Sequence, residues 1–231
     1  MSSGYNLRDI IDQLDRLQFG SQNQKHELSD LYEVKIKNMG NAGRNGGEYY
    51  TPRPLIKAII KVVAPKIGQT IYDGAAGSAG FLCESFAYLS ESKQLTTSDV
   101  ATLQKNTFYG KEKKSLAYII GTMNMILHGA GGADIEHGDT LATPLHKTKD
   151  GEVRPFDRVI ANPPFSQNYK KADMQLKERF NTFMPESGKK ADLMFVQHML
   201  ASLKANGKAA VVMPHGVLFR GAEERTCRKD F

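Results

Sequence analysis

Hydrophobic and polar positions follow two different rhythms along the chain, and the change falls near residue 40. Before it, apolar residues recur at helical spacing in two stretches, 5–19 and 26–39. The first stripe contains Leu7, Ile10, Ile11, Leu14 and Leu17, and the second contains Leu28, Leu31 and Val34. This spacing predicts two amphipathic helices that pack on each other or on a partner.

From residue 54 onward, short apolar runs alternate with longer helical patterns. Strands are predicted at 70–73, 107–110, 156–162 and, as a buried strand, 208–215. Helices are predicted at 55–64, 81–92, 115–129 and 191–205. Such βα alternation predicts an α/β fold with a mostly parallel sheet and helices on both faces.

Two stretches do not follow this alternation. Residues 40–52 are rich in glycine and mark a boundary or a loop over a site. The polar stretch from Ser166 to Lys190 lacks periodicity and is typical of a long functional loop or an insertion.

Composition and charge narrow the class of protein. The 231 residues are 40% hydrophobic and contain two cysteines, and the chain has no apolar run long enough to span a membrane. These features predict a cytoplasmic globular protein, with no membrane partner and no disulfide framework. The net charge of +6 favours a polyanionic partner such as nucleic acid, although a solvated lysine-rich surface gives the same number.

The stretch IYDGAAGSAGFL, residues 71–82, places Asp73 at a strand end, followed by small residues and a helix. Ligands of open α/β sheets bind beyond the carboxyl ends of the strands. Small residues would let a ligand lie against the backbone, although a tight βα turn needs them too. Glu112 ends the next strand, where an acid can accept hydrogen bonds from a ribose, and Asp139 lies at a third candidate strand end.

The spacing argues against two common nucleotide sites. GAAGSA is not the G-x-G-x-x-G of dinucleotide enzymes, and the chain has no G-x-x-x-x-G-K-[ST] phosphate loop. A small nucleoside with a charged tail fits better, and S-adenosyl-L-methionine is the leading candidate. The histidines show no metal-ligand spacing with cysteines or with each other, so no metal site is expected.

The stretch NPPF, residues 162–165, ends a predicted strand near this turn. The side-chain oxygen of Asn162 and the carbonyl of Pro163 could each accept a hydrogen from the exocyclic amine of a nucleobase. Pro164 restricts Pro163 to an extended conformation, which aims that carbonyl. Phe165 offers a ring on which an extruded base can stack.

Together these motifs resemble the γ-ordered DNA methyltransferases that modify adenine N6. The set GEYYTPRPL, YGKE, GDTL, NPPF, ADLMFVQHMLASL and GKAAVVMPHGVLFRG is similar to the modification (M) subunit of type I restriction-modification systems. The resemblance implies a Rossmann-like S-adenosylmethionine-dependent methyltransferase fold with a short N-terminal helical segment. It divides the chain into an N-terminal helical segment, 1–39, and a C-terminally incomplete catalytic domain, 40–231.

The resemblance also assigns roles to residues. Asn162, Pro163, Pro164 and Phe165 would be catalytic. The residues that would bind or line the cofactor site are Glu48, Tyr49, Tyr50, Thr51, Pro52, Arg53, Asp73, Gly77, Ser78, Ala79, Gly80, Glu112 and Asp139. The chain departs from the family at two positions: Gly74 stands where many relatives have proline, and Ala79 where many have glycine.

The implied partners are double-stranded DNA, a separate specificity subunit, a second M subunit and, optionally, restriction subunits. Two other functions stay open. An N-methyltransferase acting on protein glutamine or on RNA can carry a similar NPP loop, and a cofactor-binding assembly module need not be catalytic.

Overall fold

The computed structural model describes residues 4–16, 34, 51–91, 94–144, 150–151, 154–188 and 190–231. Its helices are α1 (Gly4–Asp15), α3 (Arg53–Val63), α4 (Gly80–Ser90), α5 (Thr97–Lys105), α6 (Ser115–Leu127), α7 (Asp192–Ala201) and α8 (Ala222–Lys229). Three short 3₁₀ turns are η2 (Lys171–Asp173), η3 (Lys177–Arg179) and η4 (His215–Leu218). The strands are β1 (Ile71–Asp73), β2 (Phe108–Glu112), β3 (Asp134–His137), β4 (Phe156–Ala161) and β5 (Leu203–Val211).

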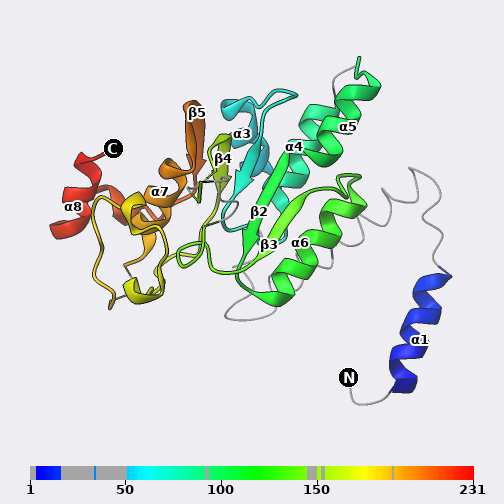
Figure 1. Ribbon diagram of the computed structural model, residues 1–231, viewed down its shortest axis with the longest axis horizontal. Helices are drawn as coiled ribbons and strands as arrows, with labels where there is room; N and C mark the ends of the chain where they lie inside the picture. Colours follow the sequence, from blue (N-terminus) through cyan, green and yellow to red (C-terminus); the bar gives the residue numbers. More distant parts are fainter. Residues whose placement is uncertain are drawn as a thin grey trace.

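The five strands form one sheet in the order β3-β2-β1-β4-β5, and each pairing between neighbours is parallel. The chain builds outward from β1 to β2 and β3, then returns to the other side of β1 with β4 and β5 (Figure 1). The direction of winding therefore reverses between β1 and β4. At such a point the strand ends diverge and open a crevice beyond their carboxyl ends.

Side chains alternate between two cores because successive residues of a strand point to opposite faces of the sheet. Ile71, Phe108 and Ile160 pack with α3, α4, α5 and α6 on one face. Tyr72, Tyr109 and Val159 pack on the other face, under α7 and the segment 166–188. The predicted α/β fold with helices on both faces is confirmed.

Three features differ from the sequence expectation. The strand predicted as buried at 208–215 runs from Leu203 to Val211 at the edge of the sheet, where Lys208 and Ala209 are exposed. Helix α5 was not predicted, and the stretch after Phe165 is packed rather than free. It has little regular structure, but Tyr169, Met174, Phe180 and Met184 are buried in the second core.

The N-terminal helices are tested only in part. Helix α1 confirms the first predicted stripe, and its Leu7, Ile10 and Ile11 are exposed. The second predicted helix lies outside the described residues except for Val34. No helix in the described ranges has the length and apolar character needed to cross a membrane.

Candidate functional site

The site lies at the crevice between β1 and β4. Asp73 is the last residue of β1, and Asn162 directly follows β4. Because the two strands are parallel neighbours, their ends meet at one edge of the sheet. Asp73, expected to line the cofactor site, and Asn162, expected to be catalytic, therefore line one cavity. They lie 89 positions apart in the sequence.

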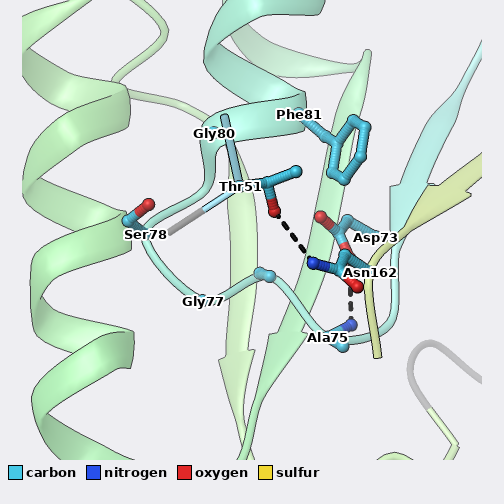
Figure 2. Close-up of a pocket in the computed structure, with 9 residues that line it drawn as sticks. Thr51, Asp73, Ala75, Gly77, Ser78, Gly80, Phe81 and Asn162 are labelled. Atoms are coloured by element: carbon cyan, nitrogen blue, oxygen red, sulfur yellow. Dashed lines mark hydrogen bonds between the residues drawn. The ribbon is translucent and has the colours of Figure 1, made fainter. Parts of the chain in front are cut away.

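The smaller of two cavities, about 20 Å³, lies between the turn after β1 and the NPPF stretch. Figure 2 shows Thr51, Asp73 and Asn162 converging on it. The Asn162 side-chain nitrogen donates a hydrogen bond to Thr51 Oγ1 at 3.2 Å. Asn162 Oδ1 is buried and has no hydrogen-bond partner among the residues that the structure describes. A buried acceptor without a partner is costly, so this oxygen is available for a donor that enters the cavity.

The larger cavity, about 330 Å³, shares Ala75 and Asn162 with the smaller one. Its lining is Ala75, Glu112, Lys113, Lys114, Asp139, Leu141, Asn162, Pro164, Gln167, Asn168, Tyr169 and Phe195. The lining combines two acids with aromatic and amide side chains. A ligand with a polar sugar and a flat ring matches this distribution.

Glu112 lines the larger cavity and binds the turn that lines the smaller one. Its Oε2 accepts a hydrogen bond from the Gly77 amide at 2.8 Å, and its Oε1 accepts one from the Lys114 amide at 2.8 Å. Each carboxylate oxygen keeps further acceptor capacity toward the larger cavity. Glu112 thus holds the turn after β1 in place as well as lining the site.

The turn after β1 is held close to helix α6. Asn124 donates from its side chain to the Ser78 carbonyl at 2.8 Å. A Cβ on Gly121 would lie 2.8 Å from the Gly77 carbonyl oxygen, so only glycine allows this approach. On the other side, Arg53 donates to the Gly80 carbonyl at 3.0 Å and lies 3.6 Å from Glu84.

The end of the NPPF stretch is anchored by α7 and by the residues before α8. The Ser166 amide donates to Asp192 Oδ1 at 2.7 Å, and Arg220 pairs with Asp192 Oδ2 at 3.2 Å. Asp192 is buried, and Ser166 has a positive φ of 55°. These contacts give a physical reason why ADLMF, GVLFRG and NPPF occur together: the first two hold the loop that follows the third.

Burial perturbs the acid in the smaller cavity. Asp73 is 1% exposed, and burial is the main reason why its pKa is raised from 3.8 to about 7. The hydrogen bond from the Ala75 amide lowers the pKa, and the neighbouring charge of Glu112 raises it further. A cation beside Asp73 would favour the ionised carboxylate.

The cavities bring together most of the predicted residues that the structure describes. Thr51, Asp73, Gly77, Ser78, Gly80 and Asn162 line the smaller one, and Glu112, Asp139, Asn162 and Pro164 line the larger one. Glu48, Tyr49 and Tyr50 lie outside the described residues. Pro52, Arg53, Ala79, Pro163 and Phe165 are absent from both linings.

Three of these five residues, Arg53, Ala79 and Phe165, lie outside the cavities in different ways. Arg53 binds the Gly80 carbonyl, so its contact is with the turn and not with either cavity. Ala79 is buried at the start of α4 with a positive φ of 59°. Phe165 is 42% exposed, which leaves its ring accessible from solvent.

Sequence reasoning missed several residues of the larger cavity, among them Phe195, Tyr169 and Leu141. Phe195 lies in an apolar helical run and carries no signal that distinguishes a cavity wall from core. Tyr169 lies in the aperiodic stretch 166–190. Among the described residues, no group of three or more His, Cys, Asp or Glu side chains is placed to hold a metal ion.

Comparison with known proteins shows the family. The sequence model of the N-6 DNA methylase family matches residues 23–231. The chain belongs to this family. It is 36% identical over 220 residues to the EcoEI type I restriction enzyme methylase subunit of Escherichia coli and 33% identical over 230 residues to the EcoKI subunit of Escherichia coli K12.

These alignments cover 95% of the chain but only 43% and 41% of the two subunits, so the chain spans less than half of their length. Among solved structures, one reported for the assembly of a type I R-M system superposes with a TM-score of 0.83 at 33% identity. It covers 99% of this chain and 45% of the other. A modification subunit of a putative type I enzyme from Vibrio vulnificus YJ016 superposes with a TM-score of 0.77 at 31% identity, over 100% of this chain and 47% of the subunit.

Proposed function

We propose that this chain transfers a methyl group from S-adenosylmethionine to the N6 amine of an adenine in double-stranded DNA, as part of a type I modification complex. The observation that carries the proposal is the unpartnered Asn162 Oδ1, buried in the cavity that Asp73 also lines. Family membership and the type I methylase relatives support the same reaction.

The linings of the two cavities suit separate parts of the cofactor, and the smaller cavity, about 20 Å³, would have to widen to admit more than a water-sized group. Glu112 would accept hydrogen bonds from the ribose hydroxyls, and Asp139 and Phe195 would border the adenine ring in the larger cavity. Asp73 and the small residues of the turn would border the amino-acid tail in the smaller cavity. The raised pKa of Asp73 fits a cationic ligand, because a nearby positive charge offsets the cost of ionising a buried carboxylate.

Asn162 would act on the target amine. The adenine amine is a weak nucleophile because its lone pair is delocalised into the ring. If Asn162 Oδ1 and the Pro163 carbonyl each accept one amine hydrogen, the lone pair is directed at the methyl group and the developing positive charge is stabilised. Thr51 supports this role, because its hydroxyl accepts from the Asn162 nitrogen and leaves the oxygen for the substrate.

The bound cofactor would supply an electrophilic methyl group on sulfur. Transfer would join the amine nitrogen to this methyl carbon as the carbon–sulfur bond breaks, and the electron pair of that bond would leave on sulfur. The surplus amine proton then leaves to water. Asn162 and Pro163 hold the nitrogen throughout, and Phe165, exposed beside them, would stack on the extruded base.

Methyl incorporation tests the proposal directly. Tritiated S-adenosylmethionine would be incubated with adenine-containing duplexes, with duplexes whose adenines already carry an N6-methyl group, with RNA and with a glutamine-containing protein. Each substrate is tested with and without a type I specificity subunit. We expect label only in the unmodified DNA, with Asn162→Ala reducing it by orders of magnitude while cofactor affinity stays near that of the parent.

Each alternative gives a different result. Label in RNA or in protein glutamine, but not in DNA, would favour the second class of N-methyltransferase. Cofactor binding without label in any substrate, with the specificity subunit present, would favour a non-catalytic assembly module.

A further inference from the structure

A chain of buried polar groups runs behind the cofactor turn, on the face of β1 opposite to α4. Arg179, at the end of η3, lies 3.0 Å from His198 Nδ1 through its NH1 nitrogen. His198 Nε2 lies 2.9 Å from the Tyr72 hydroxyl, and Thr140 donates to the Gly74 carbonyl at 2.5 Å. The Tyr72 hydroxyl packs against the same glycine, since a Cβ on Gly74 would lie 2.9 Å from it and 3.3 Å from the Thr140 methyl group.

The chemistry of these groups determines which atom donates in each of the two contacts of His198. A guanidinium only donates, so His198 Nδ1 must accept and Nε2 must carry the hydrogen. His198 is neutral, because burial and the nearby Arg179 and Lys111 hold its pKa well below the usual value. Nε2–H therefore donates to Tyr72, and Thr140 separately donates to Gly74.

Both ends of the chain reach segments that line the cavities. Gly74 lies between Asp73 and Ala75, which border the smaller cavity. The NH2 nitrogen of Arg179 donates to the carbonyls of Thr140 and Leu141, directly after Asp139. Arg179 thus holds the segment after Asp139 itself and reaches Gly74 through Thr140, while His198 connects it to Tyr72.

Burying the Arg179 side chain costs free energy that a purely structural role would not require. Its side chain is buried, and burial lowers its pKa to about 10. Within the described part of the chain, no carboxylate forms an ion pair with it, and its Nε has no hydrogen-bond partner. A buried cation is unfavourable unless it is well compensated, and an apolar residue could fill the same volume at lower cost.

We propose that Arg179 and His198 are positioning residues for the cofactor site, acting through Tyr72 and Thr140 on the turn at Gly74. Arg179 belongs to the stretch that follows NPPF, so this relay links the segment next to the target base with the segment that holds the cofactor. The link to the cofactor rests on the proposed function, whereas the link to the turn does not.

Amide hydrogen exchange of the ligand-free chain tests the relay itself. The Ala75 amide is bonded to Asp73 Oδ1 at 3.0 Å, and the Leu141 amide is bonded to Asp139 Oδ1 at 2.9 Å, so each reports on one segment. Tyr72→Phe removes the hydroxyl and keeps the ring that stacks on Phe156. We expect exchange at Ala75 to speed up at least ten-fold in Tyr72→Phe, and at both amides in Arg179→Met.

A matched control separates this effect from a general loss of stability. Thr107→Val removes another buried hydroxyl, bonded to the Thr102 carbonyl at 2.9 Å, without touching the relay. In Thr107→Val, the exchange rates of the Ala75 and Leu141 amides should stay within two-fold of those in the parent. Unchanged exchange at both amides in Tyr72→Phe and in Arg179→Met, or equal acceleration in Thr107→Val, would overturn the proposal.

Two further measurements complete the test. The ¹⁵N spectrum of the His198 ring should show a protonated Nε2 and a bare Nδ1, and the opposite tautomer would contradict the relay. For cofactor binding, Tyr72→Phe and Arg179→Met should weaken S-adenosylmethionine affinity five- to thirty-fold, and raise its KM with little change in the KM for DNA. If the parent binds no cofactor, the proposed function fails, and the exchange result still decides the relay.

Discussion

At the scale of single residues, Thr51 binds the nitrogen of the Asn162 amide. Its hydroxyl accepts from the amide nitrogen, so the oxygen is left for the substrate. Thr51→Val keeps the shape and removes the acceptor, which allows the amide to turn over. We expect kcat to fall roughly ten- to a hundred-fold with cofactor affinity within about two-fold of the parent.

Single-turnover methylation with isothermal calorimetry of the cofactor separates these two effects. Thr51→Ser retains the hydroxyl and is the control, with turnover close to the parent. Equal loss of turnover in the serine and valine variants would show that Thr51 acts through packing and not through the Asn162 amide.

Asp73 makes stability depend on pH. Its pKa is about 7 in the folded chain against 3.8 ordinarily, so between these values the folded state holds a proton that the unfolded state has lost. Stability therefore falls as pH rises through this window and stays low above it. The full effect would be at most roughly 4 kcal/mol in the free energy of unfolding.

Asp73→Asn removes this dependence while keeping the side-chain oxygen that accepts from the Ala75 amide. Urea unfolding at pH 5 and pH 8 measures the effect. We expect the difference in free energy of unfolding, variant minus parent, to be larger at pH 8 than at pH 5. A stability difference that is the same at both pH values would mean that Asp73 titrates near its ordinary pKa.

At the scale of elements, the join between β1 and its turn depends on a matched pair. A Cβ at Gly74 would lie 2.9 Å from the Tyr72 hydroxyl and 3.3 Å from the Thr140 methyl group. A proline at this position would meet the same atoms, so Tyr72 gives a physical reason for glycine here. Gly74→Ala should destabilise the chain by about 1–3 kcal/mol, as expected for overpacking.

A double-mutant cycle with Tyr72→Phe checks this explanation. Removing the hydroxyl removes the closest contact, so Gly74→Ala should cost less in the Tyr72→Phe background. Thermal unfolding of the four proteins gives the coupling free energy. Additive effects would show that the hydroxyl of Tyr72 is not what requires glycine at position 74.

The elements also show what the sequence could and could not predict. The strands that end at Asp73, Glu112 and Asn162 were predictable, because each is a short apolar run before a polar residue. Helix α5 was missed because its pattern is weakly amphipathic, although the capping box between Thr96 and Asp99 is a readable start signal. The prediction that β5 is buried was wrong, because an apolar run does not reveal which strand lies at the edge of a sheet.

The candidate site was predictable where its residues belong to motifs and hidden where they meet only through the fold. Asp73, Glu112 and Asn162 could be named because Asp73 and Glu112 end their strands and Asn162 directly follows one. Phe195 and Arg179 could not be named, because their partners are distant in sequence and the sheet order that brings them together is not encoded in any local pattern. Long-range hydrogen bonds of buried groups leave no periodic signal.

At the scale of the whole molecule, the net charge of +6 predicts salt-sensitive binding to DNA. Lys170 and Lys177 are exposed on the segment that follows NPPF. Each lysine that neutralises a phosphate adds about 0.9 to the magnitude of the slope of log K against log salt. The double variant Lys170→Gln, Lys177→Gln should therefore reduce the magnitude of that slope by up to about 2.

Fluorescence anisotropy with a labelled duplex at several salt concentrations measures this slope. The double variant Lys61→Gln, Lys66→Gln is the control, because it makes the same charge change on exposed residues near the amino end of β1, away from the site. The control should keep the slope of the parent, since long-range charge alone does not release a condensed counterion. Equal loss of slope in both double variants would show that net charge, and not the segment after NPPF, determines how the chain meets DNA.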